Sequence, residues 1–111
     1  TMTWMQPELS GTPPQAREAH TMTLVGTKLY LFGGFGGNCL NDLHVFDTQR
    51  LRWMQPEICG TPPPGRHGHT ANLIGHKMFV FGGDGKKGRI DELRIFDTAE
   101  GKWDRPTLPT E

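Results

Sequence analysis

Residues 53–103 read W-M-Q-P-E-I-C-G-T-P-P-P-G-R-H-G-H-T…M-F-V-F-G-G…E-L-R-I-F-D-T…W, and residues 4–53 carry nearly the same letters. The two copies are offset by 49 residues as far as Gly34 and by 50 residues from Leu43 onward. A period near 50 residues indicates that the chain builds one supersecondary unit per period. The repeat therefore decides the architecture before any single residue is considered.

Each period contains four extended stretches that end at turn residues. We expect strands at residues 20–25, 28–32, 42–46 and 51–54, and again at 69–74, 77–81, 92–96 and 102–105. The second stretch is apolar on both sides, which is typical of a strand buried on both faces. Glycine and proline recur too often for a helix, and no ten-residue stretch has a helical period. The sequence predicts an all-β chain, in which each period folds as a four-stranded antiparallel meander. Stacked meanders form the blades of a β-propeller.

The sequence features that the two copies share resemble those of the kelch-repeat family over essentially the whole chain. A glycine pair ends the second strand, an arginine and a histidine open the first, and an Asp-Thr turn precedes a tryptophan. Glycines at the end of a buried strand let backbones converge near a propeller axis. The tryptophans are expected to pack between neighbouring blades. The residues assigned to this scaffold are Trp4, Gly33, Gly34, Trp53, Gly82, Gly83 and Trp103.

The repeats divide the chain into residues 1–8, 9–57 and 58–111. The first range matches only the outer strand of a preceding or neighbouring blade, and the other two are complete kelch repeats. Two blades cannot close a ring, so each exposes a stacking face. The chain is a segment of a longer propeller, a module that closes by self-association, or a poorly folded fragment. We expect a ring-forming homo-oligomer, in which three chains supply six blades. Residues 1–8 then complete a blade of another chain or lie redundant outside the ring.

The loop after the glycine pair differs most between the copies, so it is the place where function is expected. The resemblance implies that partners bind at this loop and at the loop between the fourth and first strands. An arginine before the first strand is suited to an acidic ligand group, although its presence in both copies favours a structural role. For the loop residues, a solvated turn is the competing interpretation. The candidate partner contacts are Arg17, Phe35, Asn38, Arg66, Asp84, Lys86, Lys87 and Arg89.

Other classes of function have little support in the sequence. Twelve basic and twelve acidic residues give a formal net charge of zero, which argues against nucleic-acid and membrane-surface binding. His67 and His69 have no third ligand in the sequence nearby, so we expect no metal site. The sequence Gly83-Asp-Gly-Lys-Lys-Gly88 lacks the helix that a phosphate site needs. We expect no cofactor and no catalytic residues, because no convergent set of titrating side chains is evident. Cys39 and Cys59 occupy non-equivalent positions, which favours a reducing, intracellular location.

The sequence thus predicts a protein–protein interaction scaffold that is not an enzyme. The alternative is a purely structural, self-assembling propeller module, natural or engineered, that has no ligand. The identity of the partner is not encoded in these patterns.

Overall fold

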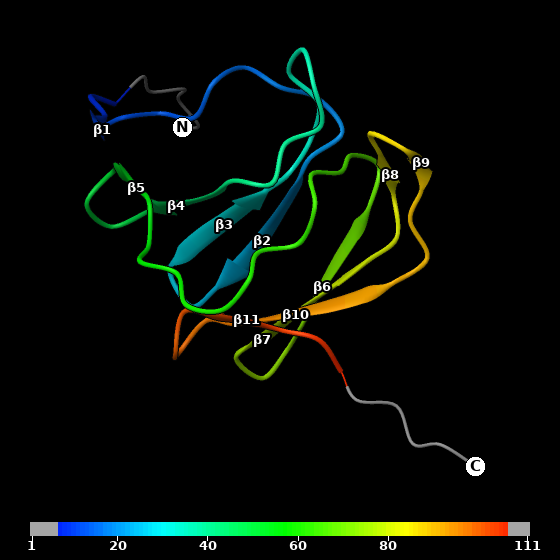
Figure 1. Ribbon diagram of the computed structural model, residues 1–111. Coiled ribbons are helices and arrows are strands. Elements are labelled where there is room, and N and C mark those ends of the chain that lie inside the picture. Colours follow the sequence, from blue (N-terminus) through cyan, green and yellow to red (C-terminus); the bar gives the residue numbers. More distant parts are fainter. Residues whose placement is uncertain (1–6, 107–111) are drawn as a thin grey trace, which may run out of the picture.

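In the computed structural model, which describes residues 7–106, the chain folds into two antiparallel sheets that lie side by side (Figure 1). Blade 1 consists of β2 (Thr21–Val25), β3 (Lys28–Phe32), β4 (Leu43–Asp47) and β5 (Arg52–Met54). Blade 2 consists of β6 (Thr70–Ile74), β7 (Lys77–Phe81), β10 (Leu93–Asp97) and β11 (Lys102–Asp104). Consecutive strands pair antiparallel in each blade. The predicted all-β fold with one four-stranded meander per repeat is confirmed.

The Asp-Thr turns form as the sequence predicts. The Oδ1 atom of Asp47 accepts hydrogen bonds from the backbone N–H groups of Gln49 and Arg50, at 2.9 and 3.0 Å. Asp97 binds the two equivalent amides of blade 2 at the same distances. These bonds satisfy the amides that the turn would otherwise leave unpaired, so each turn fixes where the outer strand begins. Within the described residues, no helix is long and apolar enough to cross a membrane.

Three short pairings were not predicted from the sequence. β1 (Ser10–Gly11) pairs parallel with the outer edge of β5, and Cys59 makes the equivalent parallel bridge to Lys102. β8 (Asp84–Gly85) and β9 (Gly88–Arg89) form a hairpin at one end of blade 2 (Figure 1). The division at residues 8 and 57 stays a prediction. The matched tryptophan of the first range, Trp4, lies outside the described residues.

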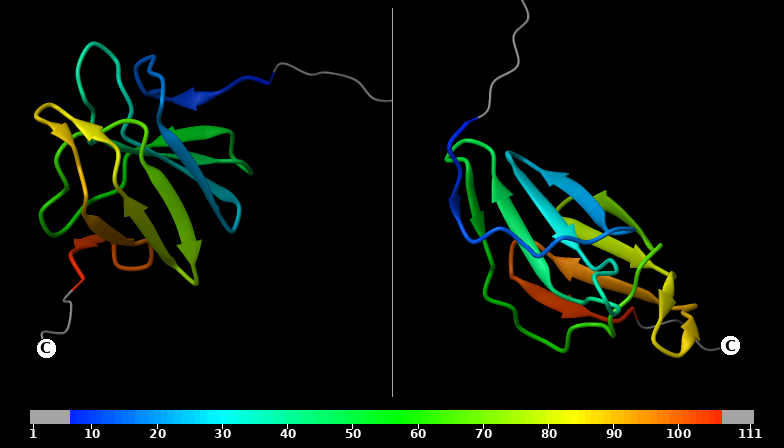
Figure 2. Two further views of the ribbon diagram at one scale, coloured as in Figure 1. Left: turned by 90° about the vertical axis from the view of Figure 1, so that its right-hand side faces the viewer. Right: turned by 90° about the horizontal axis from the view of Figure 1, so that it is seen from above.

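The core lies between the two blades, which pack face to face (Figure 2). We call the side of a blade that carries its tryptophan the front face and the opposite side the back face. The front face of blade 2 covers the back face of blade 1, and we call this contact the inner interface. Trp103 lies against Phe32 of blade 1 and Phe96 of its own blade, with ring centroids 5.0 Å apart in both pairs. The other buried members of this core are Leu43, Met78 and Val80.

The two outer faces of the pair are open. Phe81, which corresponds to the buried Phe32, is 52% exposed on the back face of blade 2. The front face of blade 1 exposes Met22 and Leu24, and the Trp53 ring packs on Phe46 of its own blade. Trp103 therefore packs between blades as predicted, whereas Trp53 does not, because no blade covers the front face of blade 1. The residues of β7 that point to the uncovered back face of blade 2 are not buried, so β7 is buried on one face only, which differs from the prediction.

The glycine pair has the steric role predicted from the sequence. Gly33 has a φ of +68°, and a Cβ atom there would lie 2.8 Å from the Arg66 carbonyl oxygen and from the His69 ring of the next blade. A Cβ atom on Gly34 would lie 2.9 Å from the carbonyl oxygen of Glu18. A side chain at Gly33 would therefore separate the two blades, whereas one at Gly34 would displace the segment before β2 of its own blade.

Candidate functional site

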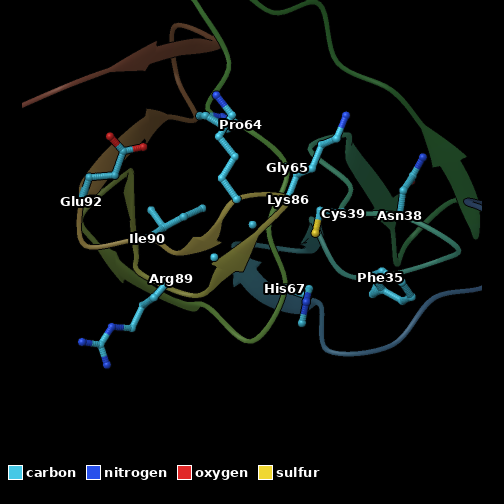
Figure 3. Close-up of a pocket in the computed structure, with 13 residues that line it drawn as sticks. Phe35, Asn38, Cys39, Pro64, Gly65, His67, Lys86, Arg89, Ile90 and Glu92 are labelled. Atoms are coloured by element: carbon cyan, nitrogen blue, oxygen red, sulfur yellow. The ribbon is translucent and has the colours of Figure 1, made fainter.

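A cavity of about 950 Å³ opens at the end of the inner interface, between loops of the two blades. Phe35, Asn38 and Cys39 border it from the loop after β3, and Lys86 and Ile90 border it from the β8–β9 hairpin and its flank. The segment that leads into β6 provides a third wall. Figure 3 shows these side chains around the cavity. The remaining lining residues are Pro64, Gly65, His67, Gly85, Lys87, Gly88, Arg89 and Glu92.

Backbone hydrogen bonds hold both loops at equivalent positions. Phe35 exchanges two backbone hydrogen bonds with Glu18, at 2.8 and 3.0 Å, and Asp84 exchanges the same pair with His67. The Phe35 ring then contacts the His67 ring across the inner interface, with centroids 5.4 Å apart. This aromatic contact closes one side of the cavity, so its shape depends on how the two blades pack.

The segment that leads into β6 is tied to blade 1 by its main chain. The N–H of Gly34 donates to the Arg66 carbonyl oxygen at 2.8 Å, and the N–H of Arg66 donates to the Leu40 carbonyl oxygen at 3.0 Å. The Asn41 side chain donates to the carbonyl oxygen of Pro63 at 3.1 Å. The cavity wall is therefore a rigid part of the inner interface, and a ligand would meet a largely preformed surface.

The cavity combines an apolar lining with free positive charge. Within residues 7–106, neither Lys86 nor Lys87 forms an ion pair, and the Arg89 guanidinium, which is 3.6 Å from Asp91, points away from the cavity (Figure 3). The only carboxylate among the lining residues belongs to Glu92. Its oxygens already accept bonds from arginines, as described next, so the free charge at the rim is positive.

Arg66 and its counterpart Arg17 bind acceptors of their own blades. The Arg66 side chain is fully buried; it donates to the Gly82 carbonyl oxygen at 3.2 Å and to Glu92 Oε1 at 2.9 Å. The Arg17 side chain is 2% exposed and donates to the Gly33 carbonyl oxygen and to Asp42. These arginines tie the loop before the first strand to the end of the second strand. We therefore leave both out of the candidate contact surface.

The paired carboxylates have lowered pKa values. The hydrogen bond from Arg17 lowers the pKa of Asp42 to about 2, with a smaller contribution from His44. Burial alone would raise the pKa of Glu92, but bonds from Arg66 and Arg105 and the charge of Arg94 outweigh it and lower that pKa. Both groups are therefore ionised at neutral pH, and neither is suited to accept a proton in general-base chemistry.

The predicted loop contacts are brought together, with one exception. Phe35, Asn38, Lys86, Lys87 and Arg89 all line the cavity. Asp84 lies beside it, with its carboxylate near Gly68. The sequence did not indicate His67 as a member of this site, because it lies outside the variable loop and reaches the cavity only through the packing of the two copies. Ile90 lies in the variable loop of blade 2, but it was not among the predicted contacts. The one usable signal was that His67 replaces Glu18 of the first copy.

The histidines next to the cavity contact other side chains of the protein. The Nε2 atom of His69 lies 2.9 Å from the Thr21 hydroxyl, and the His67 ring packs on Phe35. No group of three or more His, Cys, Asp or Glu side chains within the described residues is placed to hold a metal ion.

Comparisons with known proteins agree with this architecture. The model of the KLHDC2/KLHL20/DRC7 Kelch-repeats domain matches residues 1–111. The Rab9 effector protein with kelch motifs from Xenopus laevis is 58% identical over 38 residues, which is 34% of this chain and 10% of that protein. Human Kelch domain-containing protein 1 is 52% identical over 46 residues, 40% of this chain and 11% of that protein. Bovine Kelch domain-containing protein 3 is 39% identical over 51 residues, 43% of this chain and 13% of that protein.

These matches thus span only about a tenth of each relative. The match over all 111 residues and the two repeated blades show that the chain belongs to the kelch-repeat family.

Proposed function

We propose that this chain is a protein-interaction module that binds an acidic, partly apolar partner segment in the cavity between its two blades. The observation that carries the proposal is that one cavity combines the Phe35 and Ile90 side chains with Lys86 and Lys87, which form no ion pair within residues 7–106. Apolar walls with a few charged groups are typical of binding sites, since the walls supply affinity and the charges fix orientation. Two ammonium groups in one cavity favour carboxylates of the partner.

The relatives are compatible with this role. The name of the Xenopus relative describes an effector of Rab9, which is an interaction role rather than a catalytic one. For this chain the proposal concerns the chemistry of the segment that it contacts.

Binding of a defined acidic peptide tests the proposal. A fluorescein-labelled peptide of alternating glutamate and leucine would be titrated with the protein, and its anisotropy compared with that of a lysine–leucine peptide. We expect saturable binding of the acidic peptide only. The double variant Lys86→Glu/Lys87→Glu should lose it by at least about tenfold. The matched control Lys77→Glu/Lys102→Glu changes the same charge on β7 and β11 and should bind as the wild type does. Equal binding by both double variants would contradict the proposal.

We also propose that the chain completes a ring by head-to-tail self-association. Leu24 and Met22 on the front face of blade 1 are 58% and 46% exposed, and Phe81 on the back face of blade 2 is 52% exposed. Apolar faces of this kind favour association. Three chains of two blades each would give six blades, with a mass of about 37 kDa (three times 12.4 kDa). Light scattering coupled to size exclusion tests this, and a concentration-independent mass of 12.4 kDa would contradict it.

A further inference from the structure

The inner interface shows how the front face of one blade covers the back face of another. Trp103 packs on Phe32 with ring centroids 5.0 Å apart, and the His69 ring packs edge-on against the same phenylalanine at 5.3 Å. The His69 Nε2 atom also lies 2.9 Å from the Thr21 hydroxyl. A second interface of the same geometry would therefore need a tryptophan and a histidine on one face, and a phenylalanine and a threonine on the other.

The two outer faces carry the same set of contact residues. The back face of blade 2 presents Phe81 and Thr70, at the positions of Phe32 and Thr21. The front face of blade 1 presents Trp53 and His20, at the positions of Trp103 and His69. If two copies of the chain join head to tail, the Trp–Phe and His–Thr contacts of the inner interface are therefore repeated between them.

One contact of the inner interface is not repeated. The Phe35 and His67 rings, 5.4 Å apart, meet at the loop end of the inner interface. On the outer faces, Asp84 takes the position of Phe35 and Glu18 takes the position of His67. The backbones are placed equivalently, because Glu18 exchanges two backbone hydrogen bonds with Phe35 and His67 exchanges the same two with Asp84. Two copies joined in the same geometry would therefore place two carboxylates where the inner interface has a phenylalanine and a histidine.

We infer that the contact between Glu18 of one copy and Asp84 of the next limits the self-association of this chain. This inference rests on the head-to-tail association proposed above. Neither Glu18 nor Asp84 forms an ion pair within the described part of the chain, and both residues are exposed. Two like charges several ångströms apart at a protein surface weaken association by roughly tenfold. The apolar faces then favour association, and the repulsion between the two carboxylates weakens it.

Sedimentation equilibrium of matched variants tests the inference. The double variant Glu18→His/Asp84→Phe installs the residue types of the inner interface, and Glu18→Gln/Asp84→Asn removes only the charges. We expect both to associate at concentrations at least about tenfold lower than the wild type. The control Glu57→Gln/Glu100→Gln removes two exposed carboxylates elsewhere and should associate as the wild type does. Thermal melts of each variant confirm that it is folded.

The outcomes separate this inference from the proposal on which it rests. If the wild type and the Glu18/Asp84 variants associate with the same midpoint, the charge pair has no effect and the inference is wrong, while self-association stands. If all variants remain monomeric at the highest concentration, both the inference and the proposed ring closure are wrong. An equal gain in association for the Glu57/Glu100 control would also overturn the inference, because net charge alone would then explain the effect.

Discussion

The Trp103 ring of blade 2 packs on the Phe32 ring of blade 1, with centroids 5.0 Å apart. This contact joins the two repeats into one hydrophobic core, since both rings are almost completely buried. The equivalent tryptophan of blade 1, Trp53, contacts Phe46 of its own blade. Equivalent residues of the repeat therefore contribute differently to stability, according to whether a neighbouring blade covers them.

The two tryptophans give the first prediction. Trp103→Ala should lower the free energy of unfolding by about 3–5 kcal/mol, because it leaves a cavity in the core. Trp53→Ala removes a half-buried ring and should cost about 1–2 kcal/mol. Urea denaturation followed by circular dichroism measures both. Equal losses would show that the inner interface is not the main core of this chain.

A backbone comparison between the copies gives the second prediction. Ala19 has a φ of +56°, whereas its counterpart in blade 2 is Gly68, with a φ of +69°. A left-handed conformation strains an L-residue, so Ala19→Gly should stabilise the protein by about 0.5 kcal/mol once the added flexibility of the unfolded chain is subtracted. Gly68→Ala should destabilise it by about 1 kcal/mol. The shifts of the urea midpoint should have opposite signs, and shifts of the same sign would contradict the strain argument.

Acid should weaken the inner interface through His69. Burial, assisted by the charge of Arg66, lowers the pKa of His69 from 6.5 to about 4. Between these values the unfolded chain binds a proton that the folded chain does not, so stability is complete above pH 6.5 and falls as the pH drops towards 4. Asp42, with a pKa of about 2, contributes to acid sensitivity only below this window.

Urea midpoints measured from pH 7.5 down to about 4.5 test this dependence. The variant His69→Gln should flatten the decline, whereas His76→Gln, at an exposed histidine, should preserve it. A decline that persists unchanged in His69→Gln would assign the acid sensitivity to other groups.

Replacing Arg66 should lower the free energy of unfolding, whereas replacing Arg89 should leave it nearly unchanged. Arg66→Met leaves Glu92 and the Gly82 carbonyl oxygen without their buried donor and should cost about 3 kcal/mol. The Arg89 side chain is 81% exposed, so Arg89→Met should change the free energy of unfolding by less than about 0.5 kcal/mol. Differential scanning calorimetry compares the two, and a small effect of Arg66→Met would reopen a role for that arginine in partner binding.

The repeat was sufficient to predict the strands, because both their apolar runs and their Asp-Thr turns depend on neighbours close in sequence. The third strands begin at Leu43 and Leu93 rather than one residue earlier, and the preceding residues, Asp42 and Glu92, bind Arg17 and Arg66 with their carboxylates. Such long-range ion pairs are not visible in local sequence patterns.

The candidate site was predicted only in part. The loops that differ between the copies marked Phe35 and Lys86 as candidate partner contacts, and both residues line one cavity; that they contact a partner stays a prediction. His67 was missed because it lies outside these loops and meets Phe35 only when blade 2 packs on blade 1, whereas Ile90 lies in the variable loop but was not selected from it. The difference between Trp53 and Trp103 has the same origin, since identical sequence motifs acquire different environments from their neighbours.

The most direct test of the central claim, that an acidic segment binds where the two blades meet, is to titrate the ¹⁵N-labelled chain with the glutamate–leucine peptide. We expect amide shift changes to concentrate at residues 35–40, 65–67 and 84–90, with no comparable changes at β5 or β11. Changes confined to β5 and β11, or a spectrum that does not respond to the peptide, would contradict the proposed function.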